Sequence, residues 1–489
     1  MKNLGKMLMN SKFRIFIIIS LILLGAFFVR LYRFNSPIAD WHSWRQADTS
    51  SVSRNFVEKG FDILNPTYQD LSNIPSGLDN PNGYRFVEFP IYNVLQAGFF
   101  KIFNTFSLEE WGRLVSVFSS LISILTIFYI LKQRGYKKAG IYASFFYAFL
   151  PFSIYYGRTI LPDQTMVMAS LLGICFFQNW LTKGKLSLLN YNFIFSLVFT
   201  SLAFLLKPYA LFFTLPIIYL AFEKFRLNVF KNYKLFLYLI LSLIPVILWR
   251  NYILRHPEGI PVSDWLFNGG DIRFKFSFFW WIFAERISKL ILGYFGVGLL
   301  VLGFIYKMKR KDLYFFLSFI FSSLLYIFVM ARGNVQHDYY QILIIPSLAI
   351  FLGFGADFLI NVFSKERRFV SYVLFLTITL FTFSFSLFQV RDYFNINNIS
   401  IVKAGEAVNR LTPKDAKIVA NYNGDTSLLY QTKRSGWPSF QNGIPSLIEM
   451  GASYLVLVNP TEKDLEIGKT YKIVEKTNDY VLFNLREKP

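Results

Sequence analysis

The sequence has one cysteine, three histidines and few charged residues for its length. Because the single cysteine is Cys175, inside an apolar block, no intramolecular disulfide can form. Charged residues make up 17% of the chain, where about 25% is usual in soluble domains. A Walker A loop, a Rossmann glycine fingerprint, a cysteine-rich metal motif and a Gly-x-Ser-x-Gly elbow are also missing. These absences exclude a disulfide-stapled domain and leave no signal for the common nucleotide-binding and hydrolase classes.

Hydrophobic residues are abundant instead, at 54% of the chain with 57 phenylalanines, and they run in blocks rather than in amphipathic stripes. The blocks are about 15–21 residues long, close to what a helix needs to cross a hydrocarbon layer of about 30 Å. The sequence therefore predicts an all-α polytopic membrane protein with about eleven transmembrane helices. The predicted spans are 15–29, 111–131, 139–156, 164–182, 189–206, 209–222, 235–250, 287–306, 312–330, 341–361 and 369–389.

The formal net charge of +21 reflects membrane topology, because lysine and arginine gather in short clusters between the apolar blocks. Basic connections are typical of cytoplasmic loops, so we expect a cytoplasmic N-terminus, an extracytoplasmic tail, membrane lipids as neighbours and no nucleic-acid partner. The predicted cytoplasmic connections are Lys132–Lys138, Lys183–Lys185, Glu223–Lys234, Lys307–Lys311 and Lys365–Arg368.

The polar parts of the chain predict a transmembrane domain over 1–395, which includes an extracytoplasmic loop at 30–110, and a small soluble α/β domain over 396–489. In the loop, Ser50–Lys59 resembles an amphipathic interfacial helix, and Pro90–Phe103 is too short and too mixed to span. In the tail, helices are expected at Ile401–Leu411 and Ser446–Met450, and strands at Lys417–Ala420, Tyr454–Val458, Tyr471–Glu475 and Tyr480–Leu485. No internal repeat is visible, which disfavours secondary transporters.

Ionisable residues avoid the interiors of the predicted spans and collect at their outer ends, so we expect a site at the outer membrane surface. Each of these residues also has an ordinary structural explanation, such as an interfacial belt or a helix cap. A carboxylate here could act as a general base, and two carboxylates with a histidine could hold a divalent cation. The candidates are Asp40, His42, Asp48, Arg85, Glu88, Arg158, Asp163, Lys207, His337 and Tyr340.

The order of these motifs resembles the C-type (GT-C) membrane glycosyltransferases. The closest branch is the protein-mannosyltransferase-like one, which includes the lipid A aminoarabinose transferase. The motifs are Arg45-Gln46-Ala47-Asp48-Thr49, Ser53-Arg54-Asn55-Phe56, Glu88-Phe89-Pro90, Arg113, Arg158 with Leu161-Pro162-Asp163, and His337-Asp338-Tyr339-Tyr340.

The resemblance implies a GT-C fold and an inverting transfer of a sugar from a polyprenyl-phosphate carrier to an acceptor hydroxyl of a glycan, lipid or protein outside the membrane. It implies that Asp48 or Asp40 is the base, an alternative that stays open because the adjacent acidic pair of the aminoarabinose transferases is replaced here by Arg45-Gln46. The lysine that follows the second-motif acid in those relatives is replaced by Phe89.

Donor phosphate recognition is therefore assigned to Arg158, Arg85, Lys207, His337 and Tyr340, with Glu88, Asp163 and His42 at the substrate or a metal. Asp40, Asp48, Glu88 and His337 are the candidate ligands of a divalent cation. Two other functions remain compatible with the sequence: a transporter or flippase of lipid-linked sugars, and a non-catalytic membrane scaffold.

Overall fold

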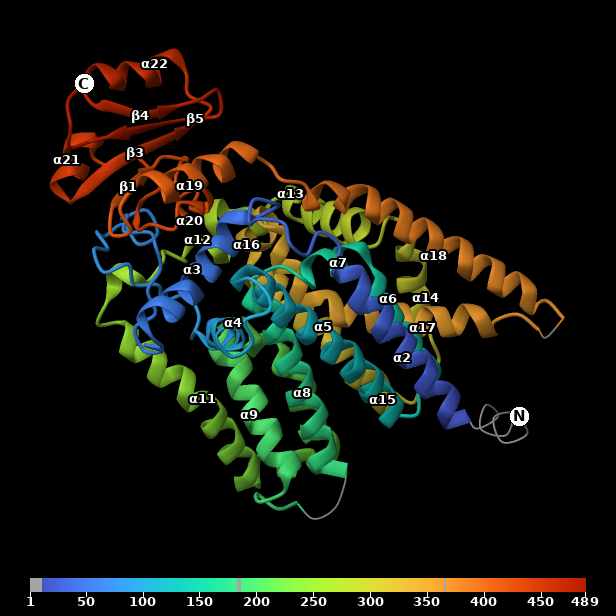
Figure 1. Cartoon of the computed structure of the whole chain (residues 1–489). Helices are drawn as coiled ribbons and strands as arrows, with labels where there is room; N and C mark the ends of the chain where they lie inside the picture. The colour runs from blue at the N-terminus through green and yellow to red at the C-terminus, as the bar shows by residue number, and fades with distance from the viewer. Residues whose placement is uncertain (1–10, 183–185, 365) are drawn as a thin grey trace. The chain divides into compact units, whose positions relative to one another are not determined.

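The computed structural model describes residues 11–182, 186–364 and 366–489 (Figure 1). The predicted basic connection Lys183–Lys185, the residue Lys365 and the first ten residues lie outside this description. The chain divides into two compact units. We call them the helical unit (Met1–Tyr32, Leu114–Ile247 and Ser263–Arg391) and the loop–tail unit (Arg33–Arg113, Leu248–Val262 and Asp392–Pro489).

Seven helices of the described residues are long and apolar enough to cross a membrane, or eight if one bent pair counts as a single span. The chain is thus a multi-pass membrane protein, but the predicted number of eleven spans is too high. The helices that meet the criterion are α2 (Ser11–Arg30), α5 (Leu108–Gln133), α8 (Pro162–Thr182), α11 (Tyr233–Ile253), α15 (Arg310–Val329), η6 with α17 (Asp338–Ile344, Ile345–Asn361) and α18 (Arg368–Val390).

A proline and positive backbone angles interrupt two of the four predicted spans that the structure does not show as single long helices. The predicted span 139–156 is divided into α6 (Lys137–Phe149) and α7 (Pro151–Tyr156) at Leu150, which is extended before Pro151. The predicted span 287–306 is bent by 112° between η5 and α14, where Gly293 and Tyr294 have positive φ. The remaining helices of this region are α9 (Tyr191–Leu206), η1 (Pro208–Thr214), α10 (Leu215–Phe225), η2 (Arg226–Lys231), α12 (Trp265–Asn268), η4 (Gly269–Phe274), α13 (Phe276–Phe279), η5 (Trp280–Ile291), α14 (Gly296–Phe304) and α16 (Ala331–Gln336).

Helix α17 forms the core of the helical unit, since nearly all of its residues are buried. Two glycines let other backbones approach it closely. A Cβ atom at Gly353 would lie 2.4 Å from the carbonyl oxygen of Ala139, and one at Gly355 would lie 1.8 Å from that of Leu299. Small residues permit such close helix packing in membranes, where van der Waals contact drives association. This packing fixes the η6 turn immediately before α17, which carries Asp338, Tyr339 and Tyr340.

The loop–tail unit contains a five-stranded mixed sheet in the order β2-β1-β3-β5-β4. β1 (Lys417–Ala420) runs parallel to β2 (Gly436–Trp437) and β3 (Ala452–Val458), whereas β5 (Tyr480–Asn484) is antiparallel to β3 and β4 (Lys472–Lys476). The predicted strands of the tail are confirmed within two residues, and β2 was not predicted. The helices of this unit are α3 (Ser43–Lys59), α4 (Ile91–Ile102), η3 (Pro257–Gly259), η7 (Arg391–Phe394), α19 (Ile399–Leu411), α20 (Ser427–Gln431), α21 (Gly443–Glu449), α22 (Glu462–Leu465) and η8 (Glu466–Lys469).

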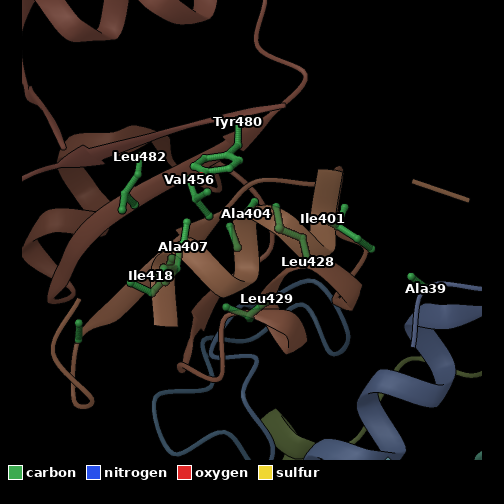
Figure 2. Close-up of a cluster of buried hydrophobic side chains, with 13 residues drawn as sticks. Ala39, Ile401, Ala404, Ala407, Ile418, Leu428, Leu429, Val456, Tyr480 and Leu482 are labelled. Atoms are coloured by element: carbon green, nitrogen blue, oxygen red, sulfur yellow. The ribbon is translucent and has the colours of Figure 1, made fainter. Parts of the chain in front are cut away.

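Alternating residues of the strands fill two cores, one on each face of the sheet. Ile418 and Leu482 pack with residues of α19 and α20 on one face (Figure 2), while Val419 and Phe483 pack with α21 on the other. The first loop enters both cores, through Ala39 on the first face and Leu71 on the second. The backbone around Leu71 also extends the sheet beyond β2, because Leu71 N donates to Gly436 O at 2.8 Å and Gly436 N donates to Gln69 O at 2.9 Å. The first loop and the tail therefore fold as one unit.

Helix α3 differs from the predicted interfacial helix at Ser50–Lys59. It begins at Ser43, and most of its residues, although polar, are buried. Hydrogen bonds from α4 satisfy them: Asn93 Nδ2 donates to Thr49 O at 2.6 Å, and Gln96 Nε2 donates to Ser50 Oγ at 3.0 Å. Buried polar groups need such partners, so α3 is an internal helix of the loop–tail unit.

Candidate active site

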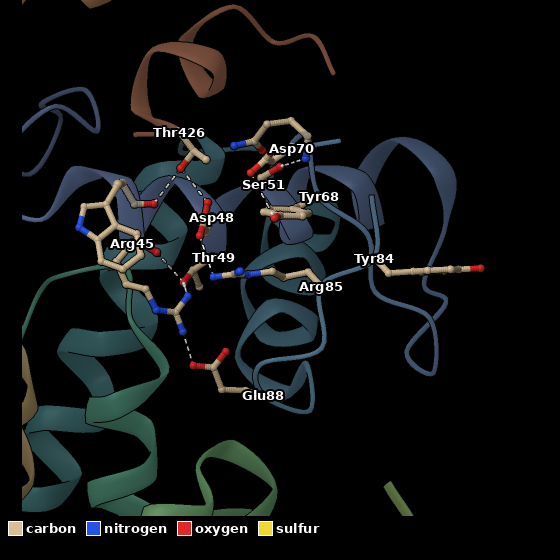
Figure 3. A network of polar contacts seen from close by, with 12 residues as sticks. Arg45, Asp48, Thr49, Ser51, Tyr68, Asp70, Tyr84, Arg85, Glu88 and Thr426 are labelled. Atoms are coloured by element: carbon tan, nitrogen blue, oxygen red, sulfur yellow. Dashed lines mark hydrogen bonds and ion pairs between the residues drawn. The ribbon is translucent and has the colours of Figure 1, made fainter. Parts of the chain in front are cut away.

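Asp48 lies at the centre of a buried polar cluster in the loop–tail unit (Figure 3). Its Oδ2 accepts a hydrogen bond from Arg85 Nη2 at 2.7 Å, and its Oδ1 accepts one from Thr426 Oγ1 at 2.7 Å. Arg85 comes from the first loop and Thr426 from the segment that precedes α20, so two distant parts of the chain hold one carboxylate. An ionised carboxylate has about four acceptor positions, and these two contacts leave room for another hydroxyl donor.

A second ion pair lies beside Asp48 and extends the cluster. Arg45, one turn earlier on α3, pairs with Glu88 through its Nη2, and its Nη1 donates to Thr49 Oγ1 at 3.3 Å. Arg45 is buried and the Glu88 side chain is 13% exposed. We call Arg45, Asp48, Arg85, Glu88 and Thr426 the Asp48 cluster.

Asp40, the other candidate base, lies just before α3 and is buried. Its Oδ1 accepts a hydrogen bond from Gln46 Nε2 at 2.7 Å, and Asn397 Nδ2 donates to its backbone oxygen at 3.0 Å. His42 occupies the N-cap position of α3 with a left-handed backbone, φ 53°. Its ring lies 5.0 Å from that of Trp41. Asp40 thus accepts from a neutral amide, whereas a guanidinium and a hydroxyl donate to Asp48.

Asp70 is a buried carboxyl group next to this cluster that the sequence did not single out. Burial raises the pKa of Asp70 to about 6, the hydrogen bonds of Ser72 oppose the shift, and the nearby charge of Asp48 adds to it. Tyr68 O–H donates to Asp70 Oδ2 at 3.3 Å, and burial, followed by the Asp70 charge, raises the pKa of Tyr68 well above its ordinary value. The guanidinium carbon of Arg85 lies 5.0 Å from the Tyr68 ring centre. Tyr68 therefore connects Asp70 to the arginine that holds Asp48.

The helical unit carries a separate group of charged residues at the N-terminal end of α8. Lys207 Nζ lies 3.0 Å from Asp163 Oδ1, and both side chains are buried. Three tyrosine rings surround this ammonium group at 5.7–5.8 Å, a distance at which cation–π attraction operates. We call Asp163, Lys207, Tyr209, Tyr339 and Tyr340 the Lys207 cluster.

The η6 turn brings further predicted residues to the helical unit. The His337 ring stacks at 5.5 Å from Tyr339 and 6.3 Å from Tyr340. Next to it, Asp338 accepts a hydrogen bond from Tyr156 O–H at 2.5 Å and lies 3.8 Å from Arg286 Nη1. Tyr156 and Arg286 were not predicted as site residues, and no local motif marks them.

Arg158 is almost fully buried, with its guanidinium carbon 5.6 Å from the Tyr155 ring centre. Arg30, at the end of α2, fixes the preceding segment: its Nη1 donates to Ala148 O at 2.9 Å and its Nη2 donates to Ser153 O at 3.2 Å. A Cβ at Gly157 would lie 2.4 Å from Arg30 Nε, so only glycine fits before Arg158.

The predicted metal ligands do not gather into a metal-binding group. Among residues 11–182, 186–364 and 366–489, no set of three or more histidine, cysteine, aspartate and glutamate side chains is placed to hold an ion. Asp48 and Glu88 each face an arginine instead. A divalent cation at these carboxylates would lie beside a guanidinium charge, so the arrangement does not fit one.

Two comparisons find similar proteins. Residues 85–249 match the family model described as dolichyl-phosphate-mannose-protein mannosyltransferase. The structure is similar to that of ArnT from Cupriavidus metallidurans bound to undecaprenyl phosphate, with a TM-score of 0.65 and 12% identity over 97% of this chain and 98% of ArnT. In sequence, no curated protein matches the chain.

The fold is also similar to the oligosaccharyltransferase of Archaeoglobus fulgidus. Its complex with Zn and sulfate has a TM-score of 0.60 at 11% identity, over 96% of this chain and 74% of the other. The form tethered with an acceptor peptide containing the NVT sequon has a TM-score of 0.58 at 10% identity, over 92% and 69%. These matches confirm the GT-C fold and the resemblance predicted from the motifs.

Proposed function

We propose that this chain, which shares the fold of the C-type membrane glycosyltransferases, is itself an inverting glycosyltransferase. It would move a sugar from a polyprenyl-phosphate donor to an acceptor hydroxyl of a glycan, lipid or protein at the outer face of the membrane. The observation that carries the proposal is the match over nearly the whole of both chains to ArnT bound to undecaprenyl phosphate. The match of residues 85–249 to a mannosyltransferase family model supports the same reaction class.

The loop–tail unit supplies the base in this proposal. A phosphate leaving group needs no general acid, so the protein must supply a base for the acceptor hydroxyl and positive charge for the phosphate. Asp48 is the first candidate because Arg85 and Thr426 hold both of its oxygens in place while leaving acceptor positions open. Asp40, held by Gln46, is the alternative. Glu88 and His42 would contact substrate.

The helical unit supplies the positive charge for the donor phosphate. Arg158 and Lys207 are the candidate cations for the phosphate. Tyr340 and His337 are neighbouring hydrogen-bond donors. Arg85 was predicted to share this role. Its contact with Asp48 supports the proposal that it positions the base instead. Asp163 would hold the Lys207 ammonium group in position at 3.0 Å.

The proposal keeps the expected topology, with the N-terminus cytoplasmic and the tail outside. The proposed donor has a long lipid tail, which stays in the membrane. A chain with seven or eight apolar helices lies in the same membrane and can meet it there.

Purified protein incubated with a panel of radiolabelled polyprenyl-phosphate sugars and membrane acceptors tests the function. We expect transfer from at least one donor, with the anomeric configuration inverted. Asp48→Asn should lower turnover about 10²–10⁴-fold with little loss of donor binding. Asp79→Asn, a change at an exposed carboxylate of the same loop, is the matched control.

Four other results would contradict parts of the proposal. If only Asp40→Asn abolishes transfer, Asp40 is the base. If both variants transfer normally, neither is. Movement of lipid-linked sugar across the proteoliposome membrane without sugar transfer would favour a flippase. Unchanged function after Asp40, Asp48 and Glu88 are substituted together would favour a scaffold.

A further inference from the structure

A polar cavity of about 630 Å³ lies in the helical unit, among the ends of four helices. Gln133 at the end of α5, Gln178 and Thr182 at the end of α8, Leu220 of α10 and Asp312 at the start of α15 line it. Asp163 and Gln178 are fifteen residues apart on α8, which places them about 22 Å apart at 1.5 Å per residue. The cavity is therefore a site distinct from the Lys207 cluster, at the opposite end of the same helix.

One arginine forms ion pairs with both carboxylates that line this cavity. Arg134 Nη2 donates to Glu223 Oε2 at 2.6 Å, and Arg134 Nη1 donates to Asp312 Oδ1 at 2.7 Å. Tyr136 O–H donates to the other oxygen of Asp312 at 3.1 Å. The Arg134 and Asp312 side chains are 8% and 5% exposed. Both acids are thus paired with the same buried, fixed arginine.

Three lysines in the lining have no such partner. Lys224, Lys309 and Lys311 all line the cavity and are exposed. Within the described part of the chain, no carboxylate lies within 4.0 Å of their ammonium groups. Four cationic side chains against two paired carboxylates leave an excess of positive charge, which attracts an anion.

We propose that this cavity binds a phosphate group, carried by the headgroup of an anionic lipid. Helices α5, α8 and α15 are long enough to span a membrane, so the cavity at their ends lies at headgroup depth. Basic pockets between transmembrane helices are suited to anionic headgroups. The loops that supply the lysines are also among the basic connections predicted to be cytoplasmic. The site is independent of sugar transfer, so its test does not depend on the proposed function.

The test measures lipid binding to the full-length protein in a neutral detergent by native mass spectrometry. Three ligands are titrated: phosphatidylglycerol, phosphatidylcholine with the same acyl chains, and inorganic phosphate as a competitor. The variant carries Lys224→Gln, Lys309→Gln and Lys311→Gln, and it leaves the Arg134 ion pairs intact. The control carries Lys231→Gln, Lys307→Gln and Arg310→Gln, which remove the same charge from the same loops outside the cavity lining.

Wild-type protein should bind phosphatidylglycerol more tightly than phosphatidylcholine. Each lysine near an anionic headgroup raises the binding affinity about fivefold. The cavity variant, which lacks three lysines, should therefore lose about a hundredfold in affinity for phosphatidylglycerol. The control variant should stay within about threefold of the wild-type affinity. If millimolar inorganic phosphate displaces phosphatidylglycerol, the cavity is a phosphate site that a soluble phosphate can also occupy. Equal losses in variant and control, or no preference for phosphatidylglycerol with no competition by phosphate, would overturn the proposal.

Discussion

Thr426→Val removes the hydroxyl that the tail places on Asp48. In the structure, Thr426 Oγ1 lies 2.7 Å from Asp48 Oδ1, and the Asp48 side chain is 5% exposed, so little water can replace the lost donor. A hydrogen bond to a charged group contributes about 1.5–3 kcal/mol. Valine has nearly the same shape as threonine, so cavity effects are small. We expect the free energy of unfolding of the loop–tail unit to fall by about 2 kcal/mol.

Tryptophan fluorescence during unfolding in detergent measures this loss, and Thr426→Ser, which keeps the hydroxyl, is the control. A double-mutant cycle with Asp48→Ala isolates the pair, because alanine removes the acceptor and an interaction between the two side chains makes their separate losses non-additive. The cycle should give a coupling of about 1–2 kcal/mol. Additive losses, or a Thr426→Val protein within about 0.5 kcal/mol of wild type, would refute the inference that the tail holds the carboxylate.

Three further predictions concern the phosphate, the pH dependence of stability and the topology. Arg158→Lys should weaken donor binding and lower turnover while the protein still folds, because lysine cannot copy the two-pronged contact of arginine with a phosphate; unchanged donor affinity would reject this role. Asp70 has a pKa of about 6 in the folded protein, above the ordinary value of about 3.9. The folded state therefore favours the protonated carboxyl group, which contributes up to about 3 kcal/mol of stability below about pH 4. That contribution is lost as the pH rises through 6. Asp70→Asn should therefore unfold at a higher temperature than wild type at pH 7.5, with no such gain at pH 4, and an equal difference at both pH values would contradict the assignment. A reporter fused after residue 395 should be extracytoplasmic and one fused at Lys309 cytoplasmic, and swapped compartments would remove the outer-face site.

Local patterns in the sequence were sufficient for four of the five strands of the tail. The strand Lys417–Ala420 was predicted with the bounds that the structure shows, and the helix 401–411 was predicted two residues short at its start. Both depend on side-chain alternation or helical periodicity, which neighbouring residues determine by themselves. β2, with two residues, is too short to carry a period, and it forms only because β1 and the backbone of Gln69–Leu71 pair with it.

The sequence singled out candidate site residues, which stay a prediction, but it did not show their partners. Asp48 and Arg85 were both singled out, yet the ion pair between them was not predicted. Thr426 could not be found by any local signal, because it is 378 residues from Asp48 in the chain. An ordinary threonine in a polar tail has no pattern that distinguishes it from its neighbours.

The sequence by itself determined that the protein is built of apolar helices, that basic loops alternate along it, and that its tail alternates helices and strands. Hydropathy and charge act over a few residues, so they can be read along the chain. Only the tertiary structure decided how many helices are long enough to span, because Leu150 and the Gly293–Tyr294 turn break apolar runs that look continuous. It also decided which arginine faces which carboxylate, since a buried charge takes the partner that folding brings within about 3 Å, whatever their separation in sequence.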